Sequence, residues 1–507
     1  MSTALEAFFA GRVHEGGRAL RRTTLRHTHL ATSPMGIVVW RLGGERFRAA
    51  AIAWGTVGEP FKIAVAGEPR NRDLYFHALV PFASDLCNAV RAAAEDRVAR
   101  TRGSRTELLP ANALQIVVAN RSTVSALGLL GRYLAYLSDR SGVPPHPQLV
   151  EAGKHLRFYA RHSRTPGQAL IVPLDRLLAE HWATLLSPLE QANLAALDAQ
   201  IEPAAGVHAF EASAAAERIT SIGPEPTEDI DRVTTELVQA FNERRGGSVD
   251  PAVVGPMLDP IAAHYRALVE PLWDLIGRTV GRERGLPAAP SVARRFEVDR
   301  EAFGRHVDWI SDGGRYRTTD TPRQAAMTLR RLEQAQSRYA AERAIEDPAC
   351  MVPYLLDGDA IRGTVANINE DHRTVVRVRS VQRPLLTLDT DDPVVLPVGK
   401  KLWWTATAHD VPWEVVSVTS HGAGSRVVLM LTTVRRNGRL PARDDRATFS
   451  TLRTRSEGFP LPLAATPPWT HQPEPPPPAP EPIDAGDAEA PPEPIDGAAV
   501  ADPEAYR

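Results

Sequence analysis

The stretch of this sequence richest in reactive side chains runs from Lys154 to Trp182 and mixes basic, aromatic and imidazole groups. Read as a helix, it places four basic side chains on one face, at steps of three and four residues: Lys154, Arg157, Arg161 and Arg164. Such a stripe beside the ring of Tyr159 could hold a phosphate backbone while an aromatic ring stacks on a base. The alternative is an amphipathic surface helix whose arginines are solvated and whose aromatic rings face a core.

A histidine in the same stretch could do acid–base or metal chemistry. His181 follows Glu180 and Asp175, and the fold would have to bring His155 or His162 close to complete such a site. Lone histidines on helices are more often half-buried packing residues, so we assign no catalytic role to this one.

A second group of acids with one histidine lies further along the chain: Glu297, Asp299, Glu301, His306, Asp308 and Asp312. The pattern His306-x-Asp308 can bind a metal in several hydrolases. Four arginines interleave with these acids, so mutual neutralisation on a helix surface is the simpler interpretation. The four are Arg294, Arg295, Arg300 and Arg305.

The absence of several catalytic sequence motifs argues against the enzyme classes that depend on them. The chain has no GxxxxGKS/T phosphate loop, no HExxH metal motif, no GxSxG serine elbow and no GxGxxG after a predicted strand. Its two cysteines, Cys87 and Cys350, are far apart in sequence, which argues against a disulfide framework and against a thiolate zinc site. We therefore predict no cofactor, no metal and no catalytic residue. The sequence favours a non-enzymatic protein over an enzyme.

The charge of the chain is unevenly distributed. The net charge is −2, but the residues from Thr466 onward carry nine acids and one Arg, so the remainder has a net charge of +6. Nearly all basic residues are Arg, which binds phosphate through a planar fork of donors, although a GC-rich genome also favours Arg. No apolar run is long enough for a membrane span and the N-terminus lacks the basic start of a secretion signal, so we expect a cytoplasmic protein.

Hydrophobic patterning predicts a multidomain α+β protein that begins with an α/β layered domain over residues 1–145. Strands are expected at 35–40, 46–54, 61–66 and 114–119, and helices at 73–94 and 122–137. This order of elements resembles the start of the ribonuclease H-like nucleases, which hold divalent metals with converging carboxylates. The first strand here, Met35–Arg41, carries no acid, and the nearest alternatives are Glu68, Asp73 and Asp85.

Residues 146–348 are predicted to form a helical domain that starts after a linker at Gly142–Pro147. Its last helix is opened by Asp320-Thr321-Pro322 and runs to about Ile345. That helix carries a second set of basic candidates for phosphate contact: Arg330, Arg331 and Arg338.

Residues 349–440 are predicted to form a small all-β barrel-like module, because short β-branched runs follow one another without a helix between them. Its basic and aromatic candidates are Arg377, Arg379, Lys400, Lys401 and Trp404. Trp403 and Trp404 should point to opposite faces of one strand. A small barrel with a free aromatic ring and a basic rim is typical of single-strand nucleic-acid binders. Peptide-binding barrels share this layout, and burial of every Trp in the core is the structural alternative.

The remaining residues, 441–507, are predicted to be a disordered, Pro-rich acidic tail in which Glu-Pro-Ile-Asp occurs twice. The leading hypothesis is a non-enzymatic accessory protein whose Arg-rich body binds nucleic acid or a nucleoprotein partner, with the tail as an internal competitor. One alternative is a scaffold that binds proteins, partly through its Pro-rich tail, without touching nucleic acid. Another is a metal-dependent hydrolase or nuclease. No membrane partner is expected.

Overall fold

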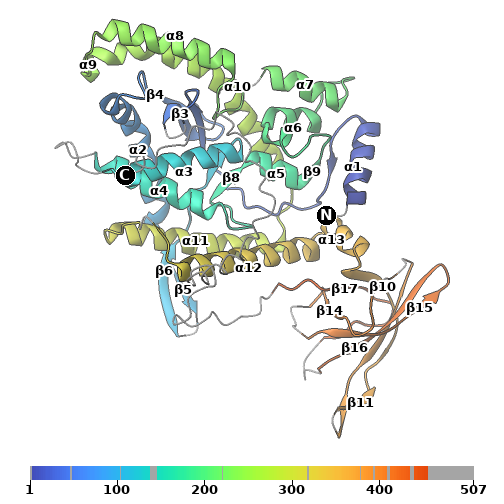
Figure 1. Cartoon of the computed structure of the whole chain (residues 1–507). Coiled ribbons are helices and arrows are strands. Elements are labelled where there is room, and N and C mark those ends of the chain that lie inside the picture. The colour runs from blue at the N-terminus through green and yellow to red at the C-terminus, as the bar shows by residue number, and fades with distance from the viewer. Residues whose placement is uncertain are drawn as a thin grey trace, which may run out of the picture.

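The N-terminal half of the chain folds around a five-stranded sheet. The structure is a computed structural model that describes residues 3–454 apart from 46–47, 103, 138–145, 220, 317–318, 377, 392–393, 395, 408–410 and 434–438. The strand order is β4-β3-β2-β7-β8, formed by Lys62–Val65, Ala49–Thr56, Met35–Arg41, Ile116–Val118 and Ile171–Pro173. β2 pairs antiparallel with β3 and parallel with β7, so the sheet is mixed (Figure 1).

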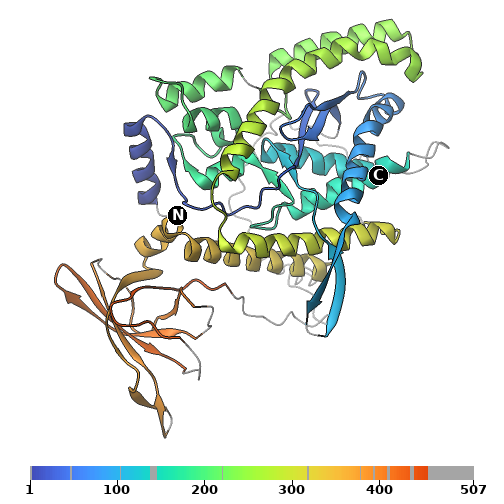
Figure 2. The same ribbon diagram turned by 180° about the vertical axis from the view of Figure 1, so that it is seen from behind.

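Helices cover both faces of this sheet, which explains why β2 is apolar from Met35 to Trp40. The helices α2 (Arg72–Glu95), α3 (Arg121–Ala135) and α4 (Pro147–His162) cover one face, and α10 (Asp259–Arg284) crosses the other (Figures 1 and 2). Alternate side chains of β2 enter the two cores: Ile37 and Val39 on the side of α2, Val38 and Trp40 on the side of α10. A strand buried on both faces has a continuous apolar sequence.

The core of this layered unit continues past residue 145, where the sequence predicted a boundary between two domains. β8 is an edge strand of the same sheet, and α4 packs closely on α3. Gly131 permits this approach, because a Cβ there would lie 2.7 Å from the backbone nitrogen of Arg157. Residues 146–173 therefore share the sheet and the core of the N-terminal α/β unit.

Smaller elements surround this unit. They are α1 (Thr3–Gly16), β1 (Leu20–Arg21) paired with β9 (Trp182–Ala183), α5 (Leu174–His181), α6 (Leu194–Ile201), α7 (Ala209–Ile219), α8 (Glu228–Arg245), α9 (Pro251–Val254) and two 3-10 turns, Glu190–Ala192 and Gly255–Leu258. The Thr227 side chain caps α8 by accepting from the backbone N–H of Ile230. Among the described helices, none has the length and apolar character needed to cross a bilayer.

Two long helices form the side of the body that faces the C-terminal module. α11 (Pro290–Ser311) and α12 (Pro322–Glu346) run side by side, and the hairpin of β5 (Arg97–Arg102) and β6 (Arg105–Pro110) extends past α11 (Figures 1 and 2). The start of α12 is the predicted one, because Thr321 and Gln324 form a capping box there. The short helix α13 (Pro348–Leu356) then leads into the barrel.

The C-terminal module is a closed six-stranded barrel, which confirms the predicted small β module. The strands around it are β10 (Ala360–Asn369), β13 (Leu385–Thr390), β16 (Gly424–Leu431), β15 (Trp413–His421), β14 (Lys401–Trp404) and β17 (Arg446–Ser450). β17 closes the barrel between β10 and β14, so the module ends beyond the predicted limit at 440. The hairpin of β11 (Arg373–Val376) and β12 (Arg379–Gln382) projects from it (Figure 1). The predicted tail from residue 455 onward lies outside the described residues.

Candidate nucleic-acid interface

The basic stripe of α4 is largely engaged in contacts within the protein. Arg157 lies over the rings of Tyr316 and Tyr136, with its guanidinium carbon 4.3 Å and 5.0 Å from the ring centres. Lys154 Nζ lies 5.9 Å from the centre of the Trp309 ring. These cations stabilise the packing of α4 through the faces of neighbouring rings.

The other α4 candidates divide between surface and core. Arg161 donates to Asp320 at 2.9 Å, and Arg164 is exposed just after the end of the helix. Tyr159 is only 1% exposed and donates its hydroxyl to the carbonyl of Leu114 at 2.7 Å. A buried ring cannot stack on a base, so we remove Tyr159 from the candidate binding set.

Two groups that the sequence presents separately meet between α4 and α11. His155 Nδ1 lies 3.1 Å from His306 Nε2, and the His306 ring stacks on Phe158 with ring centres 4.1 Å apart. His162 Nε2 lies 2.7 Å from an oxygen of Asp299. Burial lowers the pKa of His306 to about 2, so this ring stays neutral at physiological pH. The cluster is therefore packed interior rather than an accessible acid–base site.

The acids of α11 are neutralised mainly by the β5–β6 hairpin. Arg97 donates to Asp308 at 2.6 Å, and Arg100 contacts Glu301. The sequence predicted neutralisation by arginines of the same helix, and of these Arg305 lies 3.7 Å from Glu301. The pattern His306-x-Asp308 thus splits between an interior ring and a surface ion pair and does not converge on one metal position.

The acids near the sheet do not converge either. β2 carries no acid, Glu68 accepts from Asn242 at 2.7 Å, and Asp85 accepts from Lys62 at 2.7 Å. Asp73 lies in the exposed first turn of α2. In the described parts of the chain these carboxylates contact amides and cations, not one another. The geometry therefore lends no support to two-metal nuclease chemistry.

The candidate histidine at position 181 is also internal. His181 Nδ1 lies 2.6 Å from an oxygen of Glu283, and both side chains are buried. Asp175 is buried as well and accepts from Arg121 at 3.1 Å. His155 and His162 lie on α4 with other partners, so the site considered for His181 is not formed.

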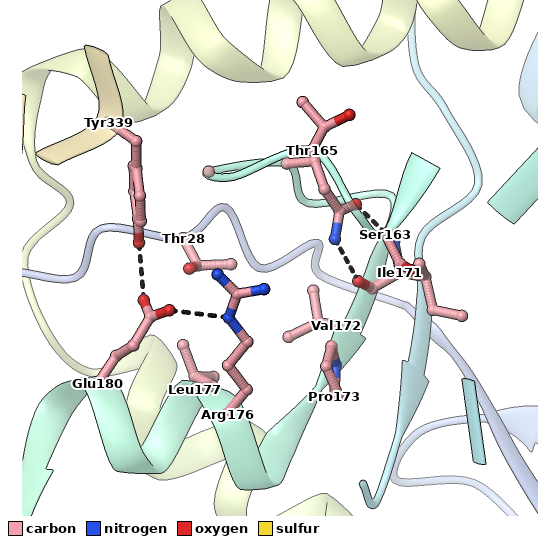
Figure 3. A pocket seen from close by; sticks show the side chains of 12 residues that line it. Thr28, Ser163, Thr165, Ile171, Val172, Pro173, Arg176, Leu177, Glu180 and Tyr339 are labelled. Atoms are coloured by element: carbon pink, nitrogen blue, oxygen red, sulfur yellow. Dashed lines mark hydrogen bonds and ion pairs between the residues drawn. The ribbon is translucent and has the colours of Figure 1, made fainter. Parts of the chain in front are cut away.

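A small pocket lies where β8, α5 and α12 meet, and Figure 3 shows its lining. Glu180 accepts from the Tyr339 hydroxyl at 2.8 Å and from Arg176 Nε at 3.0 Å (Figure 3). Burial alone would raise the pKa of Glu180, but Arg343 and Arg176 outweigh it and lower that pKa. These polar groups are hydrogen-bonded and ion-paired with one another, and the contacts link the C-terminal turns of α12 to α5.

The N-terminal two thirds of α12, by contrast, are uncovered. No residue from Pro322 to Arg338 is buried. The segment carries four arginines and one acid: Arg323, Arg330, Arg331, Arg338 and Glu333. Arg338 donates to Glu342 at 2.8 Å, whereas Arg330 and Arg331 have no ion pair within the part of the chain that the structure describes. We call Arg323, Arg330 and Arg331 the α12 surface.

The tryptophans of the barrel divide as their alternation on one strand predicts. Trp404 is 8% exposed and belongs to the barrel core with Trp413. Trp403 faces outward, half-buried, and the guanidinium of Arg453 lies 4.9 Å from the centre of its ring. We therefore remove Trp404 from the candidate binding set, because its ring is enclosed by the strands.

The basic candidates of the barrel are spread over its two ends. Lys400 Nζ lies 3.6 Å from Asp359, and Lys401 is exposed at the start of β14. Arg379 is exposed at the start of β12, on the projecting hairpin, and Arg377 lies outside the described residues. The sequence cluster at 377–404 is thus two separate basic sites (Figure 1).

The β11–β12 hairpin is the most exposed basic element of the barrel. From Arg373 to Arg383 the chain has four arginines and no acid. Val375 and Val378 on this hairpin are 75% and 96% exposed, so these two side chains point away from the barrel core. The hairpin forms an independent two-stranded ribbon between β10 and β13, whose residues Asn369 and Leu385 pair at its base.

Helix α12 lies along the side of the body nearest the barrel (Figures 1 and 2). α12 extends from the region of the β5–β6 hairpin at one end to α13 and the barrel at the other (Figures 1 and 2). Helix α4 lies between α3 and α11 (Figure 1). Of the three sequence clusters, the one on α4 is thus largely engaged in internal contacts, and the one in the barrel is divided between two sites.

Comparison with known proteins adds no relative. No family model matches the sequence, no curated protein matches it, and no solved structure matches the fold.

Proposed function

We propose that this protein is a non-enzymatic nucleic-acid-binding protein, and that the α12 surface holds the phosphate backbone. The observation that carries the proposal is the uncovered segment Pro322–Arg338, a helix of net charge +3 without one buried residue. Arginine is suited to phosphate because its planar fork of donors matches the phosphate oxygens.

The barrel supports the same proposal. Small closed barrels commonly bind nucleic acid, and an exposed two-stranded ribbon has the width of a major groove. The β11–β12 hairpin offers such a ribbon with Arg373, Arg379 and Arg383 and no acid between them. We place the protein in the cytoplasm, since Cys87 and Cys350 are both free thiols.

The proposal is tested by reversing two charges of the α12 surface. Arg330→Glu with Arg331→Glu should weaken binding of labelled DNA or RNA by at least about tenfold at low salt, and should reduce the salt slope of log K by about 2. Fluorescence anisotropy measures both quantities. Neither residue is buried, so the melting temperature should change little.

The matched control is Arg244→Glu, an exposed arginine on α8 at the end of the molecule opposite the barrel (Figure 1). It reverses one charge away from the proposed interface, half the charge change of the double variant, and should keep most of the affinity for nucleic acid. Equal loss of affinity in both variants would show that the effect comes from the net charge of the protein and not from the α12 surface. Co-purification of protein partners from a lysate, with no nucleic acid bound at low salt, would favour the scaffold alternative.

The acidic tail provides a second prediction. Deleting residues 466–507 removes a charge of −8 and should tighten nucleic-acid binding and steepen its salt dependence, because the tail would otherwise compete for the basic surface. Anisotropy titrations of full-length and truncated chains between about 50 and 200 mM salt measure both effects. Identical titrations of the two chains would contradict the role of the tail as an internal competitor.

A further inference from the structure

Three metal-binding side chains meet where α2 packs on α4. Cys87 comes from α2, and Glu151 and His155 lie one turn apart on α4. Their ligand atoms, the Cys87 sulfur, a Glu151 oxygen and a His155 nitrogen, all lie within 4.8 Å of one another. A tetrahedral zinc ion needs ligand atoms roughly 3.3–3.8 Å apart, so small rotations of these side chains would close the site.

The imidazole of His155 is oriented toward this group, and its Nε2 makes no hydrogen bond there. The ring is 2% exposed, and its Nδ1 lies 3.1 Å from His306 Nε2. Its Nε2 is buried without a hydrogen bond and lies 3.7 Å from Glu151 Oε1. If His155 donates from Nδ1 to His306, its Nε2 lone pair faces a carboxylate, which is unfavourable unless a cation lies between them.

We propose that Cys87, Glu151 and His155 bind one Zn²⁺ or a similarly thiophilic divalent ion, with His306 orienting His155 from behind. Thiolate, imidazole and carboxylate are all established zinc ligands, and an oriented histidine is the usual arrangement around such an ion. The sequence alone argued against a thiolate zinc site, because the two cysteines are far apart. The structure shows that the other two ligands come from a different helix.

Binding exchanges a proton for the metal. Cys87 is fully buried, and burial favours the uncharged thiol over the thiolate when no metal is bound. The metal forms a bond to the sulfur as the thiol proton leaves to solvent, and affinity should therefore rise with pH. Arg91 donates to both oxygens of Glu151 at 3.0 Å, but its side chain is 51% exposed and can turn away. The bound ion would link α2 to α4.

The second cysteine provides a matched control. Cys350 lies near His27 and Asp347 in a similar group. The oxygens of Asp347 are already occupied, because they accept from Thr24 and Leu25 and cap α13 through Ala349. The guanidinium of Arg343 also lies 3.8 Å from the Cys350 sulfur, where it would repel a metal ion. This group holds the N-terminal segment through Asp347, and we do not assign a metal ion to it.

Cobalt substitution tests the proposal in the full-length, reduced protein. One equivalent of Co²⁺ should give a thiolate-to-metal absorption band that Zn²⁺ then removes. Cys87→Ser should abolish the band and Cys350→Ser should keep it. Glu151→Gln, at a side chain that is 25% exposed and so tolerant of change, should keep the band but weaken Co²⁺ binding.

Three results would overturn the proposal, two of them spectroscopic and one an affinity. One is a wild-type protein that shows no thiolate band with Co²⁺ while its circular dichroism remains that of the folded protein. The second is a band that survives Cys87→Ser or disappears in Cys350→Ser. Because Glu151→Gln preserves both cysteines and the buried core, unchanged Co²⁺ affinity in that variant would also exclude the assigned ligand set.

Discussion

Lowering the pH from 7 to 5 is expected to destabilise the fold by several kcal/mol. Burial, together with neighbouring cations, lowers the pKa of His27 to about 4, and burial lowers the pKa of His306 to about 2. The unfolded chain takes up a proton on each histidine near pH 6.5, whereas the folded chain does not. Stability is therefore fully present above pH 6.5 and is lost as the pH falls, by about 1.4 kcal/mol per pH unit for each histidine.

Urea denaturation at a series of pH values between 7 and 5 measures this slope. His306→Gln removes one of the histidines whose pKa is lowered in the fold and should reduce the slope by about 1.4 kcal/mol per pH unit. The matched control is His77→Gln, at an exposed side chain on α2, which should leave the slope unchanged. A wild-type stability that is flat across this range would contradict the buried, neutral assignment of His27 and His306.

Replacing Glu283 by Ala is expected to cost about 3–5 kcal/mol of stability. Glu283 is fully buried, and its two oxygens accept from His181 Nδ1 at 2.6 Å and Trp182 Nε1 at 2.9 Å. Truncation leaves both donors without a partner in the interior between α5 and α10. Glu283→Gln retains an acceptor of nearly the same shape, so it should lose less stability.

Chemical denaturation of these variants provides the measurement, with Glu236→Ala as the control. Glu236 pairs with Arg232 at 3.2 Å on the surface of α8, where both side chains are more than 60% exposed. Loss of such a surface pair should cost less than about 1 kcal/mol. If Glu283→Ala cost no more stability than Glu236→Ala, the His181–Glu283 contact would not stabilise the protein interior.

The parts of the fold that the sequence could predict are those governed by local pattern. The uninterrupted run from Met35 to Trp40 indicates a strand buried on both faces, and β2 is that strand. Thr321 with Gln324 indicates the start of a helix, and α12 begins there. The short β-branched runs after Pro348 indicate a barrel because its strands are consecutive and carry no intervening helix.

The continuation of the sheet and its core past residue 145 could not be predicted in this way. The Pro-rich segment before α4 resembles a linker, but linker composition does not report what the next helix packs against. Gly131 and Gly153 at the contact of α3 with α4 are the available signal, since small residues allow two helices to approach. Pairing of β8 with β7 is a long-range contact that no local pattern encodes.

The candidate site was predictable only in part, because exposure depends on tertiary packing. Arg157 and Arg330 look alike in sequence, yet Arg157 lies over two tyrosine rings and Arg330 lies on an uncovered helix. Tyr159 and Trp404 are similarly enclosed by elements distant in the chain. The sequence places His155 and His306 in separate groups, and only the packing of α4 on α11 brings them together.

The central claim is tested most directly by titrating labelled single-stranded and duplex nucleic acid with the full-length protein over a series of salt concentrations. Binding through the α12 surface predicts a linear fall of log K with log salt and a slope that becomes about 2 shallower in the Arg330→Glu, Arg331→Glu variant but not in Arg244→Glu. Absence of binding at low salt, for both the full-length chain and the chain lacking residues 466–507, would contradict the claim.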